Sequence, residues 1–76
     1  MTKYDVKGYA GPNHHAGVPV GTLLVHTWHI GESSKDIEVS IWVERIKTGD
    51  ASKCEVLLKG KIIEVWDICG KHTLTH

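Results

Sequence analysis

The stretch that decides the fold runs from Asp36 to Ile46 and reads Asp-Ile-Glu-Val-Ser-Ile-Trp-Val-Glu-Arg-Ile. Apolar and polar residues alternate along it, and successive side chains of a β-strand point to opposite faces of its sheet. The pattern therefore predicts a strand with one face on the core. The predicted inner face carries Ile37, Val39, Ile41 and Val43. The predicted outer face carries Glu38, Ser40, Trp42 and Glu44.

A second predicted strand precedes this one. Residues 22–30 are rich in β-branched and aromatic residues, and the polar stretch 31–36 that follows has the composition of a turn. So short a connection favours an antiparallel hairpin. On the strand 22–30, Trp28 shares a face with His26, which predicts a core tryptophan beside a buried, hydrogen-bonded histidine.

The segment from Cys54 to Cys69 admits two interpretations. Ser52 and Glu55 have the spacing of a helix capping box, and a helix over 53–69 would end at Gly70. Gly60 in its middle and several β-branched residues favour extended structure instead. We expect one long strand bent at Gly60, or two strands joined by a wide turn.

A tight hairpin at Lys59-Gly60 is disfavoured, because simple pairing would place Glu55 opposite Glu64. Residues 4–9 fit an edge strand, and residues 71–76 read as a tail. The predicted fold class is mostly β, a small antiparallel sheet or barrel of four to five strands in a single domain over 1–76. The alternative is an α+β fold, with an antiparallel hairpin and a C-terminal helix over 53–69.

Length and charge limit the classes of function. The chain has 76 residues, with nine basic and nine acidic side chains. A core this small leaves little net stability, so a homo-oligomer is expected. The balanced charge makes nucleic-acid binding unlikely. No segment has the length and apolar composition of a signal peptide or a membrane span, which predicts a cytoplasmic protein without membrane contact. Cys54 and Cys69 are expected as reduced thiols.

The loop over residues 8–21 holds four glycines and two prolines, and loops of this length often carry function. His14 and His15 lie in it. A metal ion there would need further ligands such as His26, and on a strand His26 and His29 point to opposite faces. We therefore assign no metal ligands, no cofactor and no catalytic residues. No serine-nucleophile or phosphate-binding motif occurs in the sequence.

Trp42 is the residue that suggests a function. On the polar face of the predicted strand 36–46, beside Glu44, its ring would be exposed unless something covers it. The sequence thus favours a small non-enzymatic interaction module that self-associates or binds a protein partner through an aromatic strand face. Its predicted binding residues are Trp42, Glu44, His14, His15 and His26. The alternative is a small metal-dependent or histidine-based catalytic domain that uses His14, His15 and His26.

Overall fold

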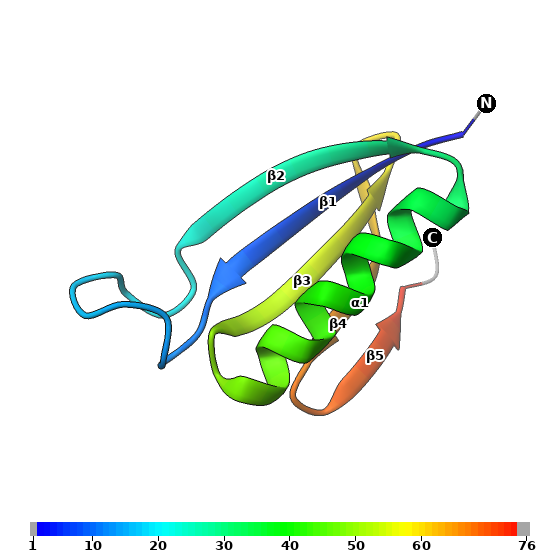
Figure 1. Cartoon of the computed structure of the whole chain (residues 1–76). Coiled ribbons are helices and arrows are strands. Elements are labelled where there is room, and N and C mark those ends of the chain that lie inside the picture. Colours follow the sequence, from blue (N-terminus) through cyan, green and yellow to red (C-terminus); the bar gives the residue numbers. More distant parts are fainter. Residues whose placement is uncertain (1, 75–76) are drawn as a thin grey trace.

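The computed structural model describes residues 2–74 and shows five antiparallel strands with one helix lying across one face of the sheet (Figure 1). The elements are β1 (Lys3–Ala10), β2 (Leu23–Ile30), α1 (Glu32–Thr48), β3 (Ala51–Leu58), β4 (Lys61–Asp67) and β5 (Gly70–Thr73). The strand order in the sheet is β2-β1-β3-β4-β5. The predicted fold class, a small antiparallel sheet of four to five strands, is confirmed.

The predicted strand over 36–46 is wrong, because these residues lie within helix α1. The helix starts after Gly31 and ends at Gly49, whose left-handed φ of 89° and N–H bond to the Ile46 carbonyl form its C-terminal cap. The side chains that α1 buries follow the helical spacing of four, three and four residues. They are Lys35, Val39, Trp42 and Ile46. Ile37 and Ile41, two of the four alternating apolar residues, therefore stay exposed.

The core lies between α1 and the central strands β1 and β3. Its buried members are Tyr4, Val6, Val39, Trp42, Ile46, Ala51, Cys54 and Val56. Gly8 lies directly beneath Trp42, and a Cβ at this position would overlap the indole ring. The predicted strand over 4–9 is confirmed as β1, but it is not an edge strand, because β1 lies between β2 and β3 and pairs with both.

The segment 54–69 is extended, as expected, and no helix forms over 53–69. A tight turn at Lys59 and Gly60 joins β3 to β4, and both residues have positive φ, 53° and 80°. The expectation against a tight turn at these two residues is wrong. A register shift between Val56 and Leu57 resolves the conflict between the two glutamates, since it places Glu55 opposite Val65.

The predicted tail also differs from the structure. Residues 70–73 form β5, which pairs with β4 from Asp67 to Glu64. Residues 75 and 76 of that tail lie outside the described part of the chain. Within residues 2–74, no helix has the length and apolar character needed to cross a membrane.

Candidate functional site

The candidate site lies between the edge strand β2 and helix α1. Opposed residues of paired strands share a face of the sheet, so Thr27 opposite Val6 and His29 opposite Tyr4 point to the helix side. We call the hollow between these elements the β2–α1 groove, with a volume of about 380 Å³. It is lined by Val25, Thr27, His29, Ser34, Ile37, Glu38, Ile41, Trp42 and Arg45.

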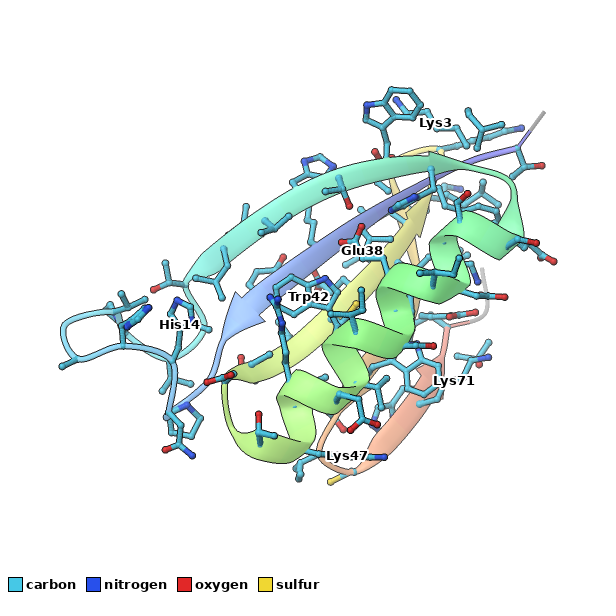
Figure 2. All side chains as sticks on the ribbon, viewed as in Figure 1. Lys3, His14, Glu38, Trp42, Lys47 and Lys71 are labelled. Carbon is cyan, nitrogen blue, oxygen red and sulfur yellow. The ribbon has the colours of Figure 1, made fainter. Side chains whose placement is uncertain are left out.

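The carboxylate of Glu38 is the polar centre of the groove. Its Oε1 accepts a hydrogen bond from the Thr27 hydroxyl at 2.5 Å and lies 2.6 Å from Nε2 of His29. Its Oε2 accepts a hydrogen bond from the indole N–H of Trp42 at 3.0 Å. Figure 2 shows Glu38 and Trp42 between α1 and the sheet. The contacts of Thr27 and His29 therefore tie α1 to the edge strand, and the bond from Trp42 lies within the helix.

The electrostatics of Glu38 follow from these contacts. Burial works to raise the pKa of this carboxyl group, but the hydrogen bonds from Thr27, His29 and Trp42 outweigh it and lower the pKa below 4.5. Glu38 is therefore ionised at neutral pH. To donate to this carboxylate, His29 must carry a proton on Nε2, which fixes the orientation of its ring.

The walls of the groove are apolar and unusually open. Ile37 is 67% exposed, Ile41 49% and Val25 38%. At the C-terminal end of the groove, the Arg45 guanidinium lies 5.0 Å from the centre of the Trp42 ring. Ligand sites of proteins combine apolar walls with a few polar groups in this way.

Comparison with known proteins gives no function for this groove. No family model, curated protein or solved structure matches the chain. The function is therefore inferred from the geometry.

Two of the predicted binding residues are placed differently from the expectation. Trp42 is not on an exposed strand face, since it lies on α1 and is 2% exposed. Its ring packs over Gly8 inside the subunit, so it is not available to contact a partner. Glu44 is exposed on the same helix, and its carboxylate lies 3.4 Å from the Lys47 amino group.

The predicted histidines do not come together as one site. His14, in the loop between β1 and β2 (Figure 2), stacks edge-on with His15 at 4.6 Å. Both line a second hollow beside Trp42 and Arg45. The prediction that His26 is buried is wrong, because it is exposed on the face of the sheet away from the helix, where its Nε2 is 3.3 Å from Asp5. Residues 2–74 contain no group of three or more side chains placed to hold a metal ion.

The helix-free face of the sheet carries a second polar cluster. The Tyr9 hydroxyl donates a hydrogen bond to the buried carboxylate of Glu55. The Lys53 amino group lies 3.6 Å from the same carboxylate and 4.7 Å from the centre of the Tyr9 ring. Burial and the hydrogen bond to Glu55 raise the pKa of Tyr9 to about 12. This cluster is internally satisfied and offers no unpaired charge.

Sequence reasoning missed the residues that form the groove and misplaced Trp28. The indole of Trp28 was expected in the core, but it is 61% exposed on the helix-free face of β2, with the Lys3 amino group 5.4 Å from its ring. The groove could have been predicted from helical spacing. Ile37, Ile41 and Arg45 follow one another every four residues, which places them on one side of a helix.

Proposed function

We propose that the protein is an interaction module that forms a homodimer by pairing its β2 strand with β2 of a second copy. The observation that carries this proposal is an uncharged edge strand of eight residues with an exposed tryptophan. It keeps the aromatic strand face predicted from the sequence but assigns it to Trp28, on a different strand.

The composition of β2 favours pairing with another strand. Proteins protect exposed edges with charged residues, proline or very short strands. The sequence of β2, Leu-Leu-Val-His-Thr-Trp-His-Ile, contains no Lys, Arg, Asp, Glu or Pro. The opposite edge of the sheet is protected, because β5 has four residues and carries Lys71.

The hydrogen-bonding pattern of β2 fixes which backbone groups are free for a second copy. The Gly31 N–H donates to the Thr2 carbonyl at 2.8 Å, which sets the alternation along the antiparallel pair. By this alternation Thr27 and His29 bond to β1. The N–H and C=O groups of His26, Trp28 and Ile30 therefore point to the free edge.

A two-fold axis at Trp28 would use all of these groups. Each Trp28 would face its counterpart, and His26 of one copy would face Ile30 of the other, which forms about six backbone hydrogen bonds. Covering the exposed part of each indole removes about 100 Å² from water, or roughly 2–3 kcal/mol per copy. The formal net charge is zero, so no overall repulsion opposes this assembly.

Sedimentation velocity over a concentration series tests the proposal. The wild-type protein is expected to sediment as a dimer. Trp28→Lys puts two like charges at the two-fold axis and should weaken the dimer at least about a hundredfold. The matched control is Ile68→Lys, which changes another exposed apolar residue, 75% exposed, beyond the far end of β4. A monomeric wild type, or a Trp28→Lys variant that dimerises like the wild type, would refute the proposal.

A further inference from the structure

We infer that the β2–α1 groove binds a medium-chain alkyl carboxylate, with the carboxylate at Arg45 and the alkyl chain along Ile41, Ile37 and Val25. The site is built within one subunit. It goes beyond the proposed dimer and does not depend on it.

The charge available at this groove is positive. Within residues 2–74, the Arg45 guanidinium has no carboxylate at ion-pair distance, and its side-chain contact is with the face of the Trp42 ring. Asp50 lines the neighbouring hollow with Arg45 but forms no ion pair with it. The planar guanidinium group has its N–H donors in a fork that matches a carboxylate.

The Glu38 carboxylate, beside Trp42 in the middle of the groove, repels an anion. Both Glu38 oxygens are already occupied by donors, and this carboxylate keeps its negative charge because its pKa is lowered. A cationic ligand would find no free acceptor there, and an anionic one is disfavoured. Arg45 is therefore the group of the groove that can accept a carboxylate, and the alkyl chain of the ligand extends from there along Ile41 toward Ile37.

The apolar wall that runs from Arg45 past Ile41 to Ile37 suits an alkyl chain. Ile37, Ile41 and Arg45 follow one another every four residues, so they lie on one side of α1. Eight residues of helix separate Ile37 from Arg45, a rise of about 12 Å. The large exposed fractions of Ile37, Ile41 and Val25 show that the chain's own side chains leave this wall uncovered. A bound alkyl chain would remove that surface from water.

The probe is octanoate below its micelle concentration, added to the ¹⁵N-labelled protein and followed by ¹H–¹⁵N NMR and calorimetry. We expect saturable binding of one octanoate per subunit, with shifts at Val25, Ile37, Ile41 and the Arg45 side chain. Octan-1-ol should bind at least tenfold more weakly, because it cannot form the ion pair. Equal binding of the alcohol, or shifts confined to residues outside the groove, would overturn the inference.

Two variants and one control complete the test. Arg45→Gln and Ile41→Ser are both expected to weaken octanoate binding by tenfold or more. Lys47→Gln removes a second cation from the same helix turn, one already near Glu44, and should leave the affinity unchanged. The groove residues concerned are exposed, and circular dichroism verifies that each variant folds. An Arg45→Gln variant that binds like the wild type refutes the site.

The monomeric Trp28→Lys variant separates this inference from the proposed dimer. It should retain octanoate binding if the groove acts within one subunit. Loss of binding in this folded variant would contradict the inference, whatever the sedimentation result for the wild type.

Discussion

Replacing Glu38 by glutamine tests the polar network that ties β2 to α1. The amide has nearly the shape of the carboxylate but only one acceptor oxygen. If that oxygen takes the place of Oε1, the amide NH₂ meets the indole N–H of the buried Trp42. If it takes the place of Oε2, the NH₂ meets Thr27 and His29. The first arrangement leaves two donors facing each other, and the second requires the Thr27 hydroxyl and Nε2 of His29 to become acceptors.

The expected cost follows from the bonds that are lost. A buried donor without an acceptor costs about 1–3 kcal/mol, and the remaining bonds lose the contribution of the charge. We expect Glu38→Gln to lower the free energy of unfolding by about 1–3 kcal/mol. A domain of this length has a total stability of about 4–11 kcal/mol, so the variant should fold with a clearly lower urea midpoint.

The stabilisation by the Glu38 network should depend on pH. Because the pKa of Glu38 is lower in the folded state than its ordinary value of 4.5, its stabilisation is complete above that value. It is lost as the pH falls through the lowered pKa. The difference in stability between the wild type and Glu38→Gln should therefore be constant at neutral pH and shrink on acidification.

Urea unfolding followed by far-UV circular dichroism measures both effects. The control is Glu44→Gln on the exposed side of the same helix, which should change stability by less than about 0.5 kcal/mol. The network explanation fails if Glu38→Gln is as stable as this control. It also fails if the difference from the wild type is unaffected when the pH is lowered.

Two further predictions concern the core. Gly8→Ala places a methyl group against the Trp42 ring and should cost about 1–3 kcal/mol in urea unfolding, with most of the loss recovered when Trp42 is also replaced by leucine. A Gly8→Ala variant as stable as the wild type would contradict this packing. Burial raises the pKa of the Cys54 thiol to about 12, so a thiol reagent at neutral pH should label the exposed Cys69 quickly and Cys54 only on unfolding. Equal labelling rates in the folded protein would show that Cys54 is accessible.

The antiparallel sheet could be predicted from the sequence, but the helix could not be placed. Over 36–46 the apolar residues fit a period of two and also a helix with apolar side chains on more than one side. Ile37 and Ile41 produced the strand-like alternation, and both are exposed in the structure. The C-terminal cap at Gly49 was the local signal that favoured a helix.

The site could not be predicted because it depends on strand order. β1 lies between β2 and β3 in the sheet, which leaves β2 at the edge and brings Trp28 to the surface. The contact between His29 and Glu38 likewise requires α1 to cross over β2. A strand over 36–46 places Glu38 on the solvent side. The hydrogen bonds from Thr27, His29 and Trp42 cannot be predicted from that placement.

The proposed dimer and the proposed ligand groove both follow from the position of β2. The core is filled by side chains from β1, β3 and α1, and no residue of β2 is buried. The strand is nevertheless eight residues long and mostly apolar, so its ordering is supported by β1 on one side and by the Glu38 network above. Ordering such a strand costs conformational entropy that exposed side chains do not offset. A second β2 at its free edge and an alkyl chain in its groove would each cover apolar surface that the single chain leaves in water.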